Sequence, residues 1–150
     1  MEDMTRIPPH SVESEQSILG SILLDKDAMI TVSETIKPDD FYKEAHKIMY
    51  ECMIKLSNKG EPIDLITLTE ELRKQGHLDD VGGISYITSL STIVPTTSNV
   101  KYYADIVKEK SVLRKLIKAS NDIINLGYDG STKIEDVLDR AEKKIFDISQ

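Results

Sequence analysis

Residues 97–126 read TSNVKYYADIVKEKSVLRKLIKASNDIINL, and this stretch decides the fold class. It contains neither glycine nor proline, the two residues that interrupt helices most strongly. Thr97 or Ser98 can accept a hydrogen bond from a free backbone amide of the first turn and so serve as the N-cap. The stretch therefore predicts one continuous helix of roughly 29 residues that ends at Leu126.

A second helix is predicted immediately after the first. Residues 127–130 begin and end with glycine and predict a turn. Thr132 and Glu135 have the spacing of a capping box, which predicts a last helix that reaches Gln150 or beyond. Two helices joined by a tight turn form an antiparallel hairpin. Apolar residues recur in steps of four and three along the last helix, as in a coiled-coil seam: Ile134, Leu138, Ala141, Ile145 and Ile148.

The long helix carries two sets of apolar residues. The first set is suited to the facing seam of the hairpin: Val100, Tyr103, Val107, Leu113, Leu116 and Ile124. The second set, Ile106, Ile117 and Ile123, widens the apolar stripe beyond what one partner helix covers. These three residues either pack against residues 1–96 or form a second contact surface for another subunit or another protein.

Upstream of this hairpin, turn-forming residues divide the sequence into shorter helices. Pro8 and Pro9 cannot lie inside a helix, and Ser11 follows them as an N-cap. Asp64 caps a later helix, and Gly76 closes it. No stretch alternates polar and apolar residues for long enough to predict a strand. The predicted helices span residues 12–24, 28–36, 41–56, 65–75 and 84–93.

The charge distribution divides the chain after residue 96. Residues 1–96 carry 9 basic and 17 acidic side chains, whereas residues 97–150 carry 10 basic and 9 acidic ones. We therefore predict an all-α protein in two parts, a compact helical head at residues 1–96 and a long antiparallel helical hairpin at residues 97–150. The overall net charge of −7 argues against a surface built to hold DNA phosphates.

The composition indicates a protein of the cytoplasm. No apolar run approaches the roughly 20 residues that span a bilayer, so no membrane contact is expected. The first residues, MEDMTRIPPH, lack the basic and apolar segments of a signal peptide. The single cysteine, Cys52, cannot form an internal disulfide, which is typical of a reducing compartment.

The sequence lacks the motifs of catalysis and cofactor binding. None of its 7 glycines belongs to a phosphate-binding loop or a dinucleotide fingerprint, so no nucleotide site is expected. The spacing of His46 and Cys52 does not place them on one helix face, and with no second cysteine a zinc site is not expected. We therefore predict no catalytic residue, no metal ligand and no cofactor site in this segment, and we predict that the segment by itself is not an enzyme.

One alternative function follows from the basic residues of the long helix. These residues are Lys101, Lys108, Lys110, Arg114, Lys115 and Lys118. The face that they form is a candidate for nucleic-acid binding. Because Asp105, Glu109 and Asp122 interrupt it, a solvated helix face explains the pattern better, and no strong direct binding of nucleic acid is expected. Such a face also suits an acidic patch on a partner protein.

Several segments, taken in order, resemble the DnaB-type replicative helicases of bacteria. RIPPHSVESEQSILGSILLD at residues 6–25 is similar to the opening signature of that family. DFYKEAHKIMYECMIKL at residues 40–56 and GEPIDLITLTEEL at residues 60–72 follow in the family's order. GGISYITSLSTIVPTTSNVKYYADIVKEKSVLRKLI at residues 82–117 resembles the passage from the family's globular head into its helical hairpin. Together, these segments extend the resemblance over nearly all of residues 6–126.

The resemblance implies the N-terminal domain of a hexameric ring helicase that unwinds DNA at the replication fork. In that family such domains form a collar of paired hairpins, a trimer of dimers, which binds the C-terminal domain of primase. ATP and Mg²⁺ are bound in a RecA-like half, which we expect to follow a linker beyond Gln150. The resemblance thus implies a non-catalytic module for ring assembly and primase docking. Its expected partners are further copies of itself and primase, and a helicase loader is a further candidate.

The resemblance also implies candidate residues for partner binding. Tyr86 in the GGISY segment, and Ile117 and Ile123 on the long helix, correspond to the surface where the family contacts primase. Glu13, in the PPHSVESEQ segment, belongs to the same expected surface. Aromatic and aliphatic side chains at the centre of a patch are the usual energetic anchors of an interface.

Overall fold

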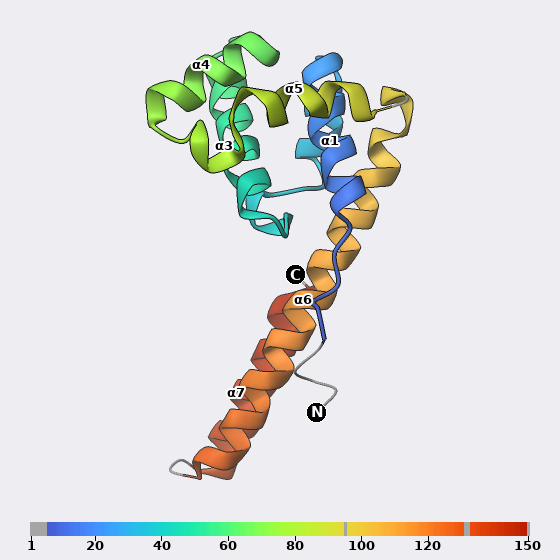
Figure 1. Cartoon of the computed structure of the whole chain (residues 1–150). Helices are drawn as coiled ribbons and strands as arrows, with labels where there is room; N and C mark the ends of the chain where they lie inside the picture. Colours follow the sequence, from blue (N-terminus) through green and yellow to red (C-terminus); the bar gives the residue numbers. More distant parts are fainter. Residues whose placement is uncertain (1–5, 95, 131–132, 150) are drawn as a thin grey trace. The chain divides into compact units, whose positions relative to one another are not determined.

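The structure, a computed structural model, describes residues 6–94, 96–130 and 133–149, and these residues form helices and short 3-10 turns without any β-strand. This confirms the all-α class (Figure 1). The chain divides into two compact units, a head unit (His10–Lys110) and a hairpin unit formed by residues 1–9 together with residues 111–150. The chain passes from one unit to the other inside helix α6, and the division after residue 96 stays a prediction. No helix of the described residues is long and apolar enough to cross a membrane.

The head unit is built from short helices whose ends follow local signals. The side chain of Ser11 accepts a hydrogen bond from the backbone N–H of Ser14 and so starts the first helix, as predicted. Asp64 caps α4 in the same way, and Gly76 ends it with a φ of 79°. The elements are α1 (Val12–Leu24), α2 (Ala28–Ser33), η2 (Pro38–Asp40), α3 (Glu44–Asn58), α4 (Leu65–Gln75), η3 (Asp79–Val81), α5 (Gly83–Ile93) and η4 (Thr97–Asn99).

Two predicted helix boundaries in the head are wrong. Helix α2 ends at Ser33, not at residue 36, and α3 begins at Glu44, not at Phe41. Pro38 opens the 3-10 turn η2 between these helices. Phe41 is extended, yet its side chain is fully buried, because the segment before α3 lies against the core. The apolar side chain of Phe41 thus indicated a buried position, but not a helical one.

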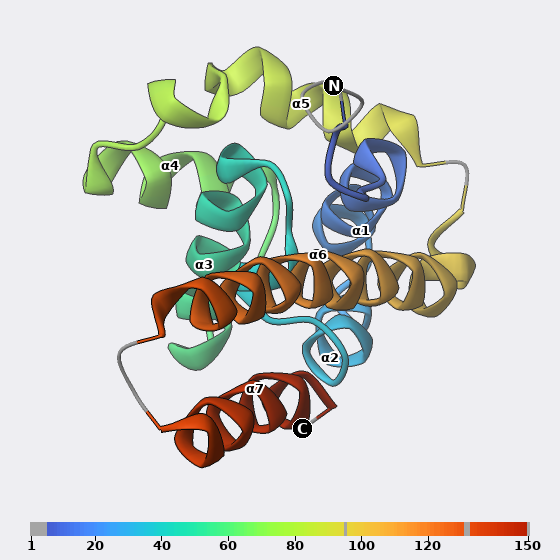
Figure 2. The same cartoon turned by 90° about the horizontal axis from the view of Figure 1, so that it is seen from below.

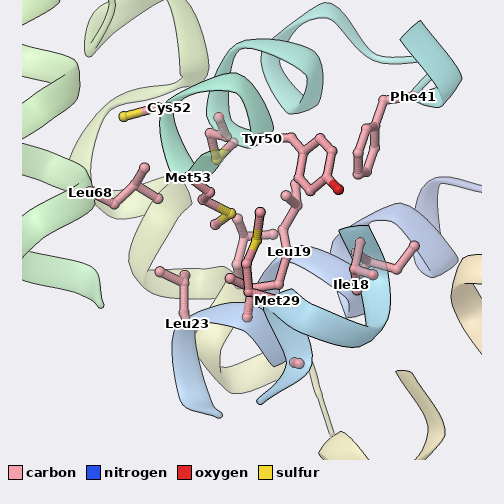
Figure 3. Close-up of a cluster of buried hydrophobic side chains, with 14 of the residues drawn as sticks. Ile18, Leu19, Leu23, Met29, Phe41, Tyr50, Cys52, Met53 and Leu68 are labelled. Atoms are coloured by element: carbon pink, nitrogen blue, oxygen red, sulfur yellow. The ribbon is translucent and has the colours of Figure 1, made fainter. Parts of the chain in front are cut away.

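The head has one hydrophobic core, to which α1, α2, α3 and α4 contribute (Figure 3). Helices α1 and α5 approach closely at Gly20, where an added Cβ would lie 2.3 Å from the carbonyl oxygen of Leu90. The glycine is therefore required by this contact. The labelled core residues are Ile18, Leu19, Leu23, Met29, Phe41, Tyr50, Cys52, Met53 and Leu68.

The first turns of α6 (Val100–Asp129) belong to the head unit. Val100, Ala104 and Val107 are buried in the head core, and Tyr103 packs against it. We expected Val100, Tyr103 and Val107 to face the last helix of the hairpin. The structure corrects this, because the start of α6 covers the apolar side of the head instead.

In the hairpin unit, α7 (Ile134–Ser149) runs back beside the second part of α6, which confirms the antiparallel hairpin (Figures 1 and 2). The ammonium of Lys144 lies 3.6 Å from the carboxylate of Asp122 and bridges the two helices. Gly127 does not begin a turn as predicted, because α6 continues through it to Asp129. Thr132, half of the predicted capping box, lies outside the described residues.

Candidate protein-interaction surfaces

Tyr86 lies in α5 on the head unit, and its phenol ring is partly buried. The side-chain amide of Gln16 donates a hydrogen bond of 3.1 Å to the Tyr86 hydroxyl. The same hydroxyl lies 2.7 Å from Nε2 of His46, and the two rings are stacked with centroids 5.9 Å apart. Gly82, with a φ of 101°, precedes the helix, and an added Cβ there would come within 2.9 Å of the Tyr86 Cβ. This turn allows Tyr86 to lie flat against the head.

Behind Tyr86, Glu15 and His46 form a buried polar pair, each with a side chain that is 1% exposed. Nδ1 of His46 lies 2.7 Å from Oε1 of Glu15. The Glu15 carboxylate also accepts hydrogen bonds from the backbone N–H groups of Tyr42, at 2.7 Å, and Lys43, at 3.3 Å. A chain of hydrogen bonds therefore links α1, the start of α3 and α5.

Glu13 lies on the first turn of α1, and its side chain is exposed. It precedes Gln16 by three residues, so the two side chains share one face of the helix. Gln16 contacts the Tyr86 hydroxyl, so Glu13 lies one turn from a residue that touches Tyr86. A shared surface of Glu13 and Tyr86 stays a prediction.

Ile117 lies in the hairpin unit, on α6, with 47% of its side chain exposed. It lines a hollow of about 570 Å³ together with Ile7, Pro8, Pro9 and residues beside them. The guanidinium of Arg114 donates a hydrogen bond of 2.8 Å to the carbonyl oxygen of Pro9 and holds this N-terminal segment along the helix. Ile117 thus lies in an apolar hollow and is accessible to solvent there.

Ile123 lies in a different hollow from Ile117. It is partly buried and lines a space shared by α6 and α7, with Ala141, Ile145 and Phe146 on the other side. Ile117 and Ile123 therefore do not form one patch within the described residues. Ile123 and these α7 residues line one open apolar hollow of the hairpin.

The coiled-coil seam predicted on α7 is largely uncovered. Among the described residues of α7, none is fully buried. Leu138 is 57% exposed, and Phe146, which the predicted seam did not include, is 59% exposed. Ile134 and Ile145 are exposed as well. The hairpin thus offers a row of apolar side chains to solvent, and such rows are common at protein–protein contacts.

The basic face of α6 is partly neutralised by carboxylates on the same chain. Lys101 pairs with Asp105 at 2.9 Å, Lys118 pairs with Asp122 at 3.4 Å, and Lys108 lies 3.5 Å from the buried carboxylate of Asp40. These lysines already have anionic partners, which weakens the case for a phosphate-binding surface. Within the part of the chain that the structure describes, no group of three or more histidine, cysteine or acidic side chains is placed to hold a metal ion.

The comparison with known families and sequences gives a consistent assignment. The model of the DnaB-like helicase N terminal domain matches residues 7–109. Replicative DNA helicase DnaB of Geobacillus stearothermophilus is 46% identical over 145 residues, which are 97% of this chain and 32% of that protein. Replicative DNA helicase DnaC of Bacillus subtilis (strain 168) has the same identity and the same coverage. The chain therefore spans about a third of the length of these relatives.

Solved structures agree with the sequence relatives. The crystal structure of the N-terminal domain of DnaB helicase from Mycobacterium tuberculosis is 42% identical and superposes with a TM-score of 0.90, covering 95% of this chain and 99% of that one. A structure of a DnaB-like replicative helicase and its interactions with primase is 26% identical, with a TM-score of 0.74, and covers 92% of this chain and 31% of that one. This chain belongs to the family of DnaB-like helicase N-terminal domains.

Proposed function

We propose that this chain is the non-catalytic collar domain of a replicative helicase, which assembles the helicase ring and docks primase at the replication fork. Self-association takes place through the hairpin, as a dimer or as a trimer of dimers in a hexameric ring. ATP hydrolysis with Mg²⁺ belongs to the RecA-like half of the proposed parent protein. The similarity to a helicase solved with its interactions with primase supports the docking role.

The observation that carries this proposal is the uncovered apolar surface of the hairpin. Helix α7 has no fully buried residue among those described, while Leu138, Ile145 and Phe146 are exposed. About half of each side chain is already covered, so burying the rest contributes roughly 1 kcal/mol each, and a surface of several favours association with another protein chain.

Replacing Ile117 with aspartate tests whether this residue belongs to the proposed association or docking surface. Ile117→Asp places a charge on the accessible apolar surface of the hairpin unit, so we expect about tenfold weaker self-association or binding of the primase C-terminal domain. Analytical ultracentrifugation measures the first and isothermal titration calorimetry the second. Ile66→Asp is the matched control, because Ile66 is also exposed but lies on α4, outside the proposed surface. Unchanged association and unchanged primase binding in Ile117→Asp, with helicity preserved, would remove Ile117 from the site.

Proposed roles for the other predicted residues follow the same division into units. Glu13 and Tyr86 form a candidate primase contact on the head, and Ile117 forms one on the hairpin. Ile123, which faces α7, acts through the packing of the hairpin. A helicase loader is a further candidate partner, and the cytoplasm is the proposed compartment.

A further inference from the structure

If His46 is neutral, the hydrogen bonds around Tyr86 have one consistent set of donors and acceptors. The Glu15 carboxylate can only accept, so the hydrogen bond of 2.7 Å requires Nδ1 of His46 to carry a proton. Gln16 donates its amide proton to the Tyr86 hydroxyl. In a neutral imidazole Nε2 is then an acceptor, and the Tyr86 hydroxyl donates to it across 2.7 Å. With these directions, every group in the chain of hydrogen bonds is satisfied.

The Glu15 carboxylate is itself held firmly in place. It is buried, and the backbone N–H groups of Tyr42 and Lys43 donate to it at the start of α3. Backbone groups at a helix start cannot rotate away as an exposed side chain can. The position of the carboxylate therefore sets the tautomer of His46, and that tautomer sets where the Tyr86 hydroxyl points.

We propose that His46 is a positioning residue for partner docking: Glu15 holds its imidazole in the Nδ1–H tautomer, and Nε2 fixes the Tyr86 ring in the orientation that binds primase. This inference rests on the proposed role of Tyr86 in primase docking. The ring is stacked on His46 on one side and bonded at its hydroxyl, so few of its rotamers remain open. A ring that is ordered before binding loses less conformational entropy on docking, which strengthens the complex.

Ring ¹⁵N chemical shifts of His46, measured on the full ¹⁵N-labelled chain near neutral pH, test whether Glu15 holds the imidazole in the Nδ1–H tautomer. We expect the Nδ1–H tautomer in the wild type. In Glu15→Gln, the amide oxygen takes the hydrogen bond from the Tyr42 N–H, and its NH₂ group faces Nδ1. The histidine is then expected to shift to the Nε2–H tautomer. An imidazolium or an Nε2–H tautomer in the wild type would overturn the inference.

Calorimetric binding of the primase C-terminal domain tests the second part. We expect about three- to tenfold weaker binding for Glu15→Gln and Tyr86→Phe, the effect of one hydrogen bond, and a larger loss for Tyr86→Ala. His77→Gln is the control, because His77 pairs with Asp80 at the surface, outside this network. Tyr86→Phe leaves Glu15 and its backbone partners intact, so it keeps the test open if Glu15→Gln does not fold.

The docking role of Tyr86 and the positioning role of His46 are distinguished by different results. If Tyr86→Ala binds primase as well as the wild type does, the proposed docking role of Tyr86 is wrong, and the inference falls with it. If Tyr86→Ala weakens binding but Glu15→Gln changes the tautomer without changing affinity, only the positioning role of His46 is wrong. Weakened binding together with the changed tautomer supports both.

Discussion

Tyr50 and Cys52 are two weakly acidic side chains in the head core, and their surroundings raise the pKa of each. Burial and the charge of Asp40 raise the pKa of Tyr50 to about 12, and its hydroxyl donates to the carbonyl oxygen of Ile36 at 2.9 Å. Burial and the charge of Glu71 raise the pKa of Cys52 to about 11. Both groups therefore keep their protons in the folded chain at pH values where the unfolded chain loses them.

This difference predicts a loss of stability in alkali. The Cys52 thiol has a pKa near 9.0 in the unfolded chain and about 11 in the folded chain. Its contribution to the free energy of unfolding is therefore fully present below pH 9.0 and is lost as the pH rises through 11. We expect the free energy of unfolding to fall by about 1–2 kcal/mol over this range from Cys52 alone. Urea unfolding at several pH values measures it. A Cys52→Ala variant with an equally steep decline would show that the thiol is not responsible.

At the scale of the helices, the ends that depend on neighbouring residues are sharply defined. In α4 the Asp64 carboxylate accepts from the Thr67 N–H at 2.9 Å, while the Thr67 hydroxyl accepts from the Asp64 N–H at 2.9 Å. Gly76 closes the helix with a left-handed φ that other residues adopt at a cost. Both ends are fixed by a few residues adjacent in sequence.

A matched pair of aspartates tests the value of this cap. Asp64→Ala is expected to lower the free energy of unfolding by about 1 kcal/mol, because it removes the acceptor for the Thr67 N–H. Asp27→Ala is the control, since Asp27 stands at the N-cap of α2 and its side chain makes no cap hydrogen bond. Chemical denaturation of both variants gives the comparison, and equal losses would contradict the assignment of the cap.

The sequence predicts those helix ends that depend on local residues, and it fails where the outcome depends on the rest of the fold. Both ends of α4 and the start of α1 are predicted because their signals, Ser11, Asp64 and Gly76, are local. Gly127 is misleading, because one glycine in an exposed helix costs only about 1 kcal/mol and α6 continues through it. Phe41 is misleading in the other direction, since its burial depends on the fold of the whole head.

The candidate site is harder to predict than the helices. The residues on which the proposed positioning of Tyr86 depends, Glu15 and His46, lie 31 positions apart in sequence, and His46 lies 40 positions before Tyr86. No spacing rule connects such residues. One signal was present: His46 lies three and four residues before Met49 and Tyr50, on the buried face of α3, where a polar side chain needs a partner.

At the scale of the whole molecule, the two units differ in how much they bury. The hydrophobic core lies in the head unit, whereas Ser111 and Ala119 are the buried residues described in the hairpin unit. A region with few buried contacts opens easily and exchanges its amide protons quickly. We therefore expect the stability of the hairpin unit to increase when another chain covers it.

Hydrogen–deuterium exchange at several protein concentrations tests this dependence. We expect protection in α7 to rise with concentration, because association covers Leu138 and its neighbours, while protection in α1 stays constant. Leu138→Asp should abolish the concentration dependence in α7. Protection in α7 that is already high at the lowest concentration, and unaffected by Leu138→Asp, would show that the hairpin is stable without a partner.

The exposed apolar row on α7 also affects how long a newly synthesised chain persists in a cell. Chaperones and proteases recognise exposed apolar side chains. In an unassembled copy, Ile134, Leu138 and Phe146 stay exposed. If the hairpin associates as proposed, assembled copies would cover this row, and unassembled copies would be removed more readily. The apolar residues proposed for association would then also limit the number of unassembled copies.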